Sequence, residues 1–363
     1  MMKIKSEKSG KSAKKAVKIT IASVIAGLFL MGCNDRGGEE AEYYLYSAMI
    51  FGAFDTGIMI RLFAQTQEDF DRFNQIIRDE LTMLHTLFDI YNTYTGINNI
   101  RTINLNAGNT PVQVDQKIID LIKMGKESYR KSGGAVNIAL GSVLTLWHDF
   151  RSGVIPDPPT EAELAEAALH TNITDIIINE AESTVFLQNP YMSLDVGGIA
   201  KGFALEHVAA RLRAEGFRSG IISAGGDVRA IGSPFDGRDY WAVGIEDPID
   251  RDGVVFGEHI AVVEIADIAI FTSGSYARFI VHDGMRLHHI IDPATLWPAD
   301  RFASVTVIHD CAKMAEILST ALFILPKDCG QNLLDNYGGE ALWVLYDGTT
   351  LMSPNFEQFV RQR

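Results

Sequence analysis

The stretch Met192–Gly232, MSLDVGGIAKGFALEHVAARLRAEGFRSGIISAGGDVRAIG, organises the rest of the chain. It predicts a strand, a glycine turn, a helix over about Ile199–Glu215, and a second strand that ends in another glycine turn. The glycine pairs Gly197–Gly198 and Gly225–Gly226 let backbone atoms come close to a ligand, because glycine carries no Cβ atom. Lys201 lies in the first turn of the helix, which is where a bound phosphate group would lie.

Two common phosphate motifs do not account for this stretch. Its glycines do not fit the G-x-G-x-x-G pattern of a dinucleotide-binding fold, and no Gly-Lys-Ser/Thr follows Gly202, as a P-loop would require. The spacing therefore leaves two interpretations open. One is a phosphate site of another kind, and the other is a pair of tight structural turns around a βαβ-like unit.

The N-terminus has the form of a targeting signal. Seven lysines and one glutamate lie between Met1 and Lys18, and the apolar run Ile19–Leu30 follows. At 12 residues this run is shorter than the ~20 residues that a membrane-spanning helix needs. It leads into Met31-Gly32-Cys33, which resembles the lipobox of a bacterial lipoprotein. We expect residues 1–32 to be a signal peptide, Cys33 to carry a lipid, and residues 33–42 to form a tether. The alternative is an ordinary signal peptide followed by a chance cysteine.

The charge of the chain restricts its partners. Residues 1–32 contribute +6 to the net charge of −14, so the mature chain carries −20. So acidic a chain argues against a nucleic-acid partner. It also disfavours direct adhesion to anionic lipid, so we expect membrane attachment through the lipid on Cys33, with the protein facing the periplasm or the cell exterior. Cys311 and Cys329 are the other two cysteines, and the sequence leaves their pairing open.

The order of the expected elements predicts a mixed α+β fold. We expect residues 43–363 to form a single large domain, because helices and strands are interspersed without strict βαβ alternation. With 47% hydrophobic residues the chain can bury a large core. We expect Asn92–Asn109 to be a loop region and Thr272–Tyr276 to be a turn. Helices are expected over Gln67–Tyr91, Asp115–Lys131, Glu161–Leu169 and Asp310–Leu325, and strands over Tyr43–Gln65, Asp175–Ile178, Thr184–Leu187, Trp241–Ile245, Ile260–Phe271, Arg278–His282 and Met285–Ile291.

Two further patterns suggest chemistry, and each has a plainer alternative. Glu316 and Thr320 are four residues apart on an expected helix, so their side chains share a face. A carboxylate and a hydroxyl suit a hard cation such as Mg²⁺. The alternative is a solvated glutamate and a threonine bonded back to its helix. His288 and His289 are neighbours in an expected strand, so they point to opposite faces and only one can address a given pocket. The alternative is a half-exposed histidine without a catalytic role.

Taken together, five motifs favour the functional interpretations. They are DVGGIAKGFA (195–204), SAGGDVR (223–229), TSG (272–274), HIIDP (289–293) and STALF (319–323). In this order they resemble the ApbE family, the FAD:protein FMN transferases. The resemblance extends from about Tyr43 to the end of the chain and includes a weaker segment over Ser132–Trp147.

The resemblance implies a fold, a reaction and partners. The fold would be ApbE-like (T-fold-like), a single domain of two lobes with the FAD site between them. A threonine hydroxyl of a target protein would attack the phosphorus on the FMN side of FAD, and AMP would leave. Mg²⁺ would clamp the pyrophosphate of the FAD substrate. The target would be an electron-transport protein with an acceptor motif of the form Asp-Gly/Ala-x-Ser-Gly/Ala-Thr. Two alternatives stay open: a Mg²⁺-dependent FAD pyrophosphatase that gives FMN and AMP, and a lipoprotein that binds FAD without turnover.

The resemblance also implies roles for particular residues. The metal ligands would be the carbonyl of Gly198, the carboxylate of Glu316 and the hydroxyl of Thr320. His289 would be the catalytic residue that takes the proton of the incoming threonine, since a neutral imidazole can accept it. The residues expected to bind FAD are Lys201, Ile290, Tyr91, Phe54, Asn137 and Thr272.

Several positions depart from the family's usual residues. Glu316 replaces an aspartate and carries one methylene more, which leaves Ca²⁺ and Mn²⁺ as alternative ions. Asn137 stands where an aspartate is usual, Ser275 follows Thr-Ser-Gly in place of an aspartate, and Leu296-Trp297 replaces a usual Gly-aromatic pair.

Overall fold

The computed structural model describes residues 42–249 and 259–362 of the chain. Glu42–Arg363 forms one compact unit. The expected signal peptide, Cys33 and nearly all of the expected tether lie outside the described residues. Among the helices within those ranges, none is long and apolar enough to cross a membrane.

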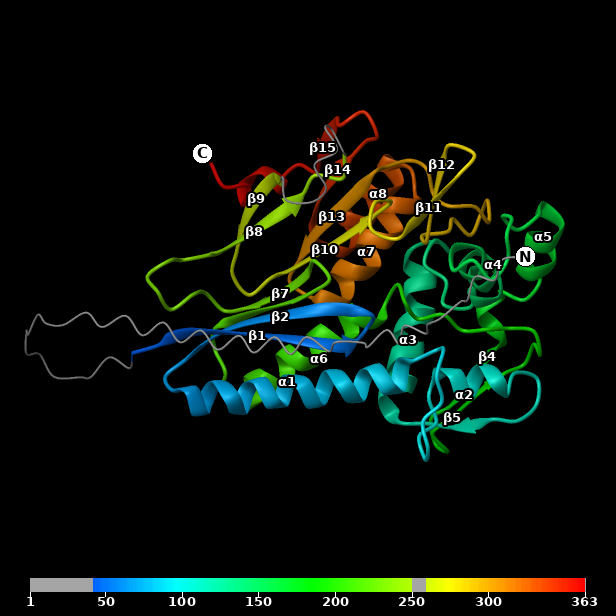
Figure 1. Ribbon diagram of the computed structural model, residues 1–363, viewed down its shortest axis with the longest axis horizontal. Coiled ribbons are helices and arrows are strands. Elements are labelled where there is room, and N and C mark those ends of the chain that lie inside the picture. Colours follow the sequence, from blue (N-terminus) through cyan, green and yellow to red (C-terminus); the bar gives the residue numbers. More distant parts are fainter. Residues whose placement is uncertain (1–41, 250–258, 363) are drawn as a thin grey trace, which may run out of the picture. The chain divides into compact units, whose positions relative to one another are not determined.

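A sheet of eight strands forms the centre of the fold (Figure 1). Every neighbouring pair in it is antiparallel. The strands in spatial order are β1 (Tyr44–Ala53), β2 (Thr56–Ala64), β6 (Gly220–Ala224), β7 (Asp227–Ile231), β10 (Ala269–Gly274), β13 (Ser304–His309), β14 (Glu340–Val344) and β15 (Thr350–Met352).

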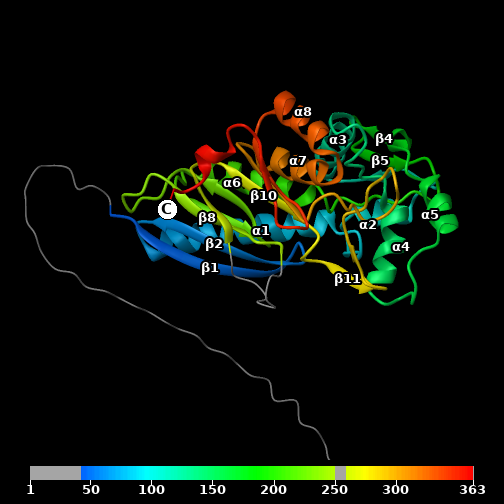
Figure 2. The ribbon, with the colours of Figure 1, turned by 90° about the horizontal axis from the view of Figure 1, so that it is seen from above.

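Different elements pack on the two faces of this sheet (Figures 1 and 2). On one face lie the helices α1 (Gln67–Phe88), α6 (Ala200–Ala214) and α7 (Ala312–Ile324), with α7 packed against both α6 and β10. On the other face lies the hairpin of β8 (Trp241–Glu246) and β9 (His259–Ile265). Successive side chains of β2 point to opposite faces of the sheet. Leu62 packs in the core on the helix side, and its neighbour Phe63 packs with Trp241 in the core on the hairpin side.

The remaining elements form a second, mostly helical region of the same unit. Its helices are α2 (Ile100–Leu105), α3 (Gln116–Lys131), α4 (Gly141–Arg151) and α5 (Glu161–Ala168), beside a small sheet of β3 (Val112–Gln113), β5 (Thr184–Leu187) and β4 (Ile176–Asn179). The hairpin of β11 (Phe279–His282) and β12 (Met285–His288) packs against α4, because Leu287 shares a core with Trp147 and Phe150. The helix α8 (Lys327–Tyr337) and the 3₁₀ turns Ile173–Asp175 and Phe356–Phe359 complete the described chain.

The stretch that organises the chain folds largely as predicted. The expected helix is α6, and the second glycine pair forms the two-residue turn between β6 and β7, with φ of 61° at Gly225 and 95° at Gly226. Such a turn favours glycine because both central residues need positive φ. The expected first strand is absent: residues 192–196 are irregular in the structure, and the side-chain amide of Asn104 bonds both the N–H (2.8 Å) and the C=O (2.9 Å) of Leu194.

Three other expectations were wrong. Asn92–Asn109 is not all loop, because Asn99 starts α2 with a capping box and Ile100 and Ile103 are buried. Ile260–Phe271 is not one strand, because the chain turns near Asp267 (φ 56°) and its halves join different sheets. Thr272–Gly274 does not belong to a turn, because these residues continue β10 and pair with β13.

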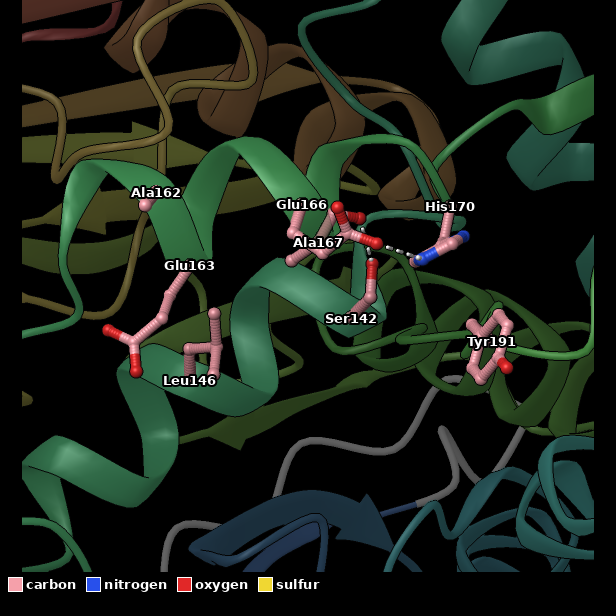
Figure 3. A pocket seen from close by; sticks show the side chains of 8 residues that line it. All are labelled: Ser142, Leu146, Ala162, Glu163, Glu166, Ala167, His170 and Tyr191. Carbon is pink, nitrogen blue, oxygen red and sulfur yellow. Dashed lines mark hydrogen bonds and ion pairs between the residues drawn. The ribbon is translucent and has the colours of Figure 1, made fainter.

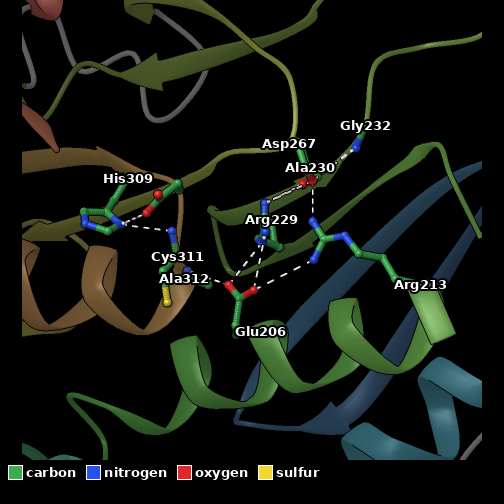
Figure 4. A network of polar contacts seen from close by, with 10 residues as sticks. Glu206, Arg213, Arg229, Ala230, Gly232, Asp267, His309, Cys311 and Ala312 are labelled. Atoms are coloured by element: carbon green, nitrogen blue, oxygen red, sulfur yellow. Dashed lines mark hydrogen bonds and ion pairs between the residues drawn. The ribbon is translucent and has the colours of Figure 1, made fainter. Parts of the chain in front are cut away.

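A polar network joins α6 to β7 and to the start of α7 (Figure 4). The carboxylate of Glu206 on α6 accepts a hydrogen bond from the backbone N–H of Ala312 (2.7 Å) and pairs with the buried guanidinium of Arg229 (3.2 Å). Arg229 also donates to the carbonyl of Ala230 (2.7 Å). The network therefore fixes the N-terminus of α7 against α6, with Glu206 as the acceptor that the first free N–H groups of a helix require.

Candidate functional site

A cavity of about 1020 Å³ lies between the sheet and the helical region. Its lining comes from segments that are far apart in the sequence, including the β1–β2 turn, α4, the start of α6, β10 and α7. Of the residues expected from the sequence to form a site, all except Cys33, which is outside the described ranges, line this cavity: Phe54, Tyr91, Asn137, Gly198, Lys201, Thr272, His289, Ile290, Glu316 and Thr320.

The close crossing of α6 and α7 places Glu316. Gly202 allows the contact, because a Cβ atom there would lie 2.5 Å from the carbonyl oxygen of Ala312 and 2.9 Å from Cβ of Glu316. The N–H of Gly202 donates to Oε2 of Glu316 at 2.7 Å. Burial raises the pKa of Glu316 to about 8, and the nearby charge of Lys201 only partly opposes this. Burial thus disfavours the charged form of Glu316, and a cation bound beside it would favour that form.

The other two expected metal ligands lie beside Glu316. Thr320 is one turn further along α7, and a Cβ atom at Gly198 would lie 4.0 Å from Oγ1 of Thr320. The described residues contain no group of three or more His, Cys, Asp and Glu side chains that could hold a metal. That finding does not conflict with a carbonyl, a carboxylate and a hydroxyl as donors, which is an all-oxygen set that fits a hard cation.

Lys201 is held by an aspartate that sequence reasoning did not single out. Asp227, in the SAGGDVR motif, is buried and forms an ion pair with Lys201. Its other carboxylate oxygen accepts a hydrogen bond from the N–H of Thr272 (3.0 Å). Burial would lower the pKa of Lys201, but the charges of Asp227 and Glu316 outweigh it and hold that pKa above its ordinary value. Asp227 directly follows the Gly225–Gly226 turn, and this position next to a glycine pair is the feature of the sequence that could have pointed to it.

Hydroxyl groups connect β10 to α7 behind the expected metal ligands. Oγ of Ser273 donates to Oγ of Ser319 (3.1 Å) and lies 3.5 Å from Oγ1 of Thr320. Ser319 in turn donates to the carbonyl of Glu316 (3.0 Å). Thr272, expected to contact the cofactor, lines the cavity, but its hydroxyl bonds to that of Thr306 (2.9 Å). Its side chain is therefore already engaged within the sheet.

The two neighbouring histidines have different surroundings. His288 is buried and its Nε2 bonds to the carbonyl of Ala299 (2.7 Å), whereas His289 lines the cavity. Nδ1 of His289 is buried without a hydrogen-bond partner in the described part of the chain. Burial, and then the positive charges of Arg278 and Arg151, lower the pKa of His289 to about 3. His289 is therefore neutral in the ligand-free protein.

Tyr91 is presented to the cavity by a loop that Asp89 holds. The buried carboxylate of Asp89 accepts from the N–H of Tyr91 (2.6 Å), from the N–H and side chain of Asn92 (both 3.0 Å) and from the hydroxyl of Tyr94 (2.7 Å). Burial would raise the pKa of Asp89, but these hydrogen bonds outweigh it and hold the pKa below its ordinary value. The ring of Tyr91 lies 5.2 Å from that of His148.

Phe54 and Asn137 lie in the lining, and each is held by hydrogen bonds to other parts of the chain. Phe54 has a φ of 53° in the β1–β2 turn, and its N–H donates to Nδ1 of His85 (3.3 Å). The amide of Asn137 donates to the carbonyl of Thr171 (3.0 Å) and accepts from the N–H of Ala139 (2.9 Å). The neutral side chain at position 137 thus shapes the wall of the cavity through local hydrogen bonds.

Several charged residues of the lining had no role in the sequence-based prediction. Asp195, the first residue of the DVGGIAKGFA motif, accepts from the N–H of Gly197 (2.8 Å), and burial raises its pKa. Arg151 and Arg278 lie outside every motif. The cavity is lined by the carboxylates of Asp55, Asp89, Asp195, Asp227, Glu246 and Glu316 and by the cations of Arg151, Lys201 and Arg278. Acidic residues outnumber basic ones in this lining, so a cation bound together with an anionic ligand would reduce the repulsion between the ligand and the lining.

A second hollow, of about 740 Å³, lies on α4 and α5 (Figure 3). It is lined by Ser142, Leu146, Ala162, Glu163, Glu166, Ala167, His170 and Tyr191. Glu166 lies 3.8 Å from Nε2 of His170, and Ser142 donates to the carbonyl of Ala167 (2.9 Å). None of the five motifs contributes to this hollow, so the larger cavity is the candidate active site.

Comparison with known proteins agrees with this geometry. The sequence model of the ApbE family matches residues 54–343. The chain belongs to the ApbE family. The FAD:protein FMN transferase of Treponema pallidum (strain Nichols) is 34% identical over 278 residues, which cover 72% of this chain and 75% of that protein. The FAD:protein FMN transferase of Klebsiella pneumoniae (strain 342) is 30% identical over 294 residues, which cover 80% and 85%.

Solved ApbE structures have the same fold. The ApbE protein of Thermotoga maritima superposes with a TM-score of 0.76 at 30% identity, over 88% of this chain and 100% of that one. The flavin transferase ApbE of Vibrio cholerae superposes with a TM-score of 0.72 at 25% identity, over 88% and 99%. The predicted family, the mixed α and β fold and the transferase class of the enzyme are confirmed.

Proposed function

We propose that this ApbE protein is a Mg²⁺-dependent FAD:protein FMN transferase, which attaches FMN from FAD to a threonine of a target protein. One observation carries the proposal: a single cavity brings together Gly198, Glu316 and Thr320 with Lys201 and His289. The flavin transferase activity itself is supported by relatives that bear this name. FAD is the substrate, and electron-transport proteins with the Asp-Gly/Ala-x-Ser-Gly/Ala-Thr motif are the proposed targets.

The ion would be held by the carbonyl of Gly198, the carboxylate of Glu316 and the hydroxyl of Thr320. It would supply the positive charge that a pyrophosphate needs in a cavity with an acidic lining. The remaining chemistry falls to the chain's own residues. The hydroxyl oxygen of the target threonine forms a bond to the phosphorus of the FMN half, and the bond from that phosphorus to the AMP phosphate oxygen breaks. AMP leaves with the electron pair.

His289 would accept the proton of the threonine hydroxyl. Its imidazole is neutral in the free protein, because burial and neighbouring cations depress its pKa to about 3. A bound pyrophosphate opposes the charges of Arg278 and Arg151 and raises that pKa, which brings the base closer to the range useful for proton transfer. Lys201, oriented by Asp227, would contact the dinucleotide beside the N-terminus of α6.

One assay tests this proposal against its two alternatives. Full-length protein is incubated with FAD and Mg²⁺, with and without an acceptor domain that bears the threonine motif. Flavin fluorescence that stays on the acceptor in a denaturing gel, together with AMP release, supports the transferase. FMN and AMP formed without acceptor indicate a pyrophosphatase, and unchanged FAD indicates a binding protein. Either of the last two results contradicts the proposal.

We also propose that Cys33 is lipidated after removal of residues 1–32 and anchors residues 43–363 to a membrane, facing the periplasm or the cell exterior. The support is the lysine-rich segment, the apolar run and the lipobox-like Met31-Gly32-Cys33. Mass spectrometry of the mature N-terminal peptide tests it, with Cys33→Ala as the control. An unmodified cysteine in the mature protein would contradict the anchor.

A further inference from the structure

Arg278 and His289 emerge together at the base of the β11–β12 hairpin. Arg278 immediately precedes β11, and His289 immediately follows β12. Phe279 and His288 are opposite each other in the register of this hairpin, so Arg278 and His289 are the next residues outward on the two strands. Both line the cavity. The hairpin therefore delivers a cation and the proposed base to the same part of the site.

The guanidinium of Arg278 is largely unused by the protein. It makes one hydrogen bond, from Nη2 to the backbone oxygen of Asp55 at 3.3 Å. No carboxylate within the described ranges forms an ion pair with it, although six carboxylates line the same cavity. Lys201, by contrast, is already paired with Asp227. Since a guanidinium offers five N–H donors in a planar fork, most of the donors of Arg278 are available to a ligand.

The positive charge of Arg278 lowers the pKa of His289, the proposed base. Among charged side chains, Arg278 has the largest effect in lowering the pKa of His289, second only to burial. A cation placed beside a proton acceptor weakens that acceptor unless an anion lies between or next to them. The arrangement is therefore unfavourable for catalysis in the empty cavity and becomes favourable when a phosphate occupies it.

We infer that Arg278 is a further catalytic residue, which donates paired hydrogen bonds to the non-bridging oxygens of the FMN-side phosphate of FAD. This rests on the proposed function. The planar fork of arginine matches two phosphate oxygens, and charge on these oxygens must be stabilised while the threonine oxygen bonds to phosphorus and the bond to AMP breaks. The proton of the threonine still passes to His289, so Arg278 supplies charge and orientation and exchanges no proton.

The test uses the full-length protein with Arg278→Met, Arg278→Lys and a matched control, Arg286→Met. Arg286 lies on the same hairpin with its guanidinium 4.5 Å from the ring of Phe279 and does not line the cavity. We expect Arg278→Met to slow FMN transfer by about 100-fold or more, as for other lost transition-state donors. Arg278→Lys should recover part of the rate, because lysine keeps the charge without the fork. Arg286→Met should match the wild type.

Binding measurements identify what Arg278 contacts. FAD should bind more weakly to Arg278→Met, whereas riboflavin, which has no phosphate, should bind as it does to the wild type. Wild-type transfer by Arg278→Met, or equal weakening for FAD and riboflavin, would overturn the phosphate contact. So would a variant with normal FAD binding that loses only its affinity for the acceptor, since Arg278 would then recognise the target protein. If the wild type neither transfers FMN nor hydrolyses FAD, the proposed function fails. The affinities of the variants for FAD and riboflavin still show whether Arg278 contacts the phosphate.

Discussion

At the scale of single residues, the hydroxyl of Thr320 is the proposed metal ligand whose removal should disturb the packing of the protein least. It lies one helical turn from Glu316 and beside Gly198, and its contact to Ser273 is long at 3.5 Å. Valine has nearly the same shape as threonine but offers no oxygen. A substitution here therefore separates the chemistry of the oxygen from the packing of α7.

We predict that Thr320→Val lowers metal-dependent turnover of FAD by about 100-fold or more, because one of few preorganised electrostatic contacts is lost. The melting temperature should stay close to that of the wild type. Thr320→Ser keeps the hydroxyl and serves as the matched control. Turnover is measured over a range of Mg²⁺ concentrations, and a fully active Thr320→Val protein would contradict the assignment of Thr320 as a metal ligand.

At the scale of elements, the position of α7 depends on its connection to α6. Gly202 permits the close crossing, and Glu206 fixes the start of α7 through the N–H of Ala312. Glu206 also neutralises the buried Arg229, as Figure 4 shows. Removal of Glu206 would leave the buried guanidinium of Arg229 with only the longer ion pair to Asp267 (3.8 Å), which is more costly than the loss of an exposed pair.

We predict that Glu206→Ala lowers the free energy of unfolding by about 3 kcal/mol or more. Glu206→Gln keeps an acceptor for Ala312 and should be milder. The control is Glu215→Ala, which removes the solvent-accessible pairs with Arg211 (2.9 Å) and Arg72 (3.5 Å) and should change stability by about 1 kcal/mol or less. Urea unfolding of the three variants is the measurement, and equal effects of Glu206→Ala and Glu215→Ala would contradict the prediction, because the network would then contribute no more than exposed ion pairs.

These elements also show what the sequence could predict. The helices α1, α3 and α7 follow from apolar periodicity, and the β6–β7 turn follows from Gly225–Gly226. The short helix α2 was missed, because its stability comes from the cap at Asn99 and from burial of two isoleucines. The break between β9 and β10 was missed although the charged Asp267, near which the chain turns, interrupts the run Ile260–Phe271. The cap at Asn99 is a local pattern that the sequence contained, whereas the burial of Ile100 and Ile103 depends on tertiary packing.

The candidate site was predictable only in part. The motifs led to Gly198, Lys201, His289 and Thr320, and the four-residue spacing on a helix led to Glu316; all five residues line one cavity. Arg151 and Arg278 were not predictable from motifs, because their significance lies in having no carboxylate partner in the described structure. The partner of Lys201 could not be assigned either, since Asp227 is 26 residues away and meets it only when β7 packs beside α6.

At the scale of the whole molecule, buried histidines make stability depend on pH. Burial lowers the pKa of His288 from an ordinary value of 6.5 to about 4, and that of His289 to about 3. The unfolded chain therefore binds protons on these side chains that the folded protein does not, between pH 6.5 and these lower values. Stability from the neutral histidines is present above pH 6.5 and is lost as the pH falls.

We predict that the low pKa of His288 alone lowers the free energy of unfolding by about 2 kcal/mol as the pH falls from 7 to 5. This figure follows from ~1.4 kcal/mol per pKa unit. Glu316 acts in the opposite direction, because its raised pKa of about 8 makes the folded state bind more protons than the unfolded state between pH 4.5 and 8. The difference in slope between the wild type and His288→Gln isolates the histidine, with the half-buried His282→Gln as the control. Parallel pH profiles for the wild type and His288→Gln would contradict the prediction.

The β11–β12 hairpin has a practical consequence for labelling the protein. Its tip, Asp283–Gly284, has φ values of 49° and 78° and is exposed, while its base carries Arg278 and His289. The pairing of β11 with β12 sets the spacing between Arg278 and His289 at the base of the hairpin. The tip only joins the two strands. A fluorophore or an affinity tag grafted at the tip would therefore leave the positions of Arg278 and His289 at the base of the hairpin unchanged.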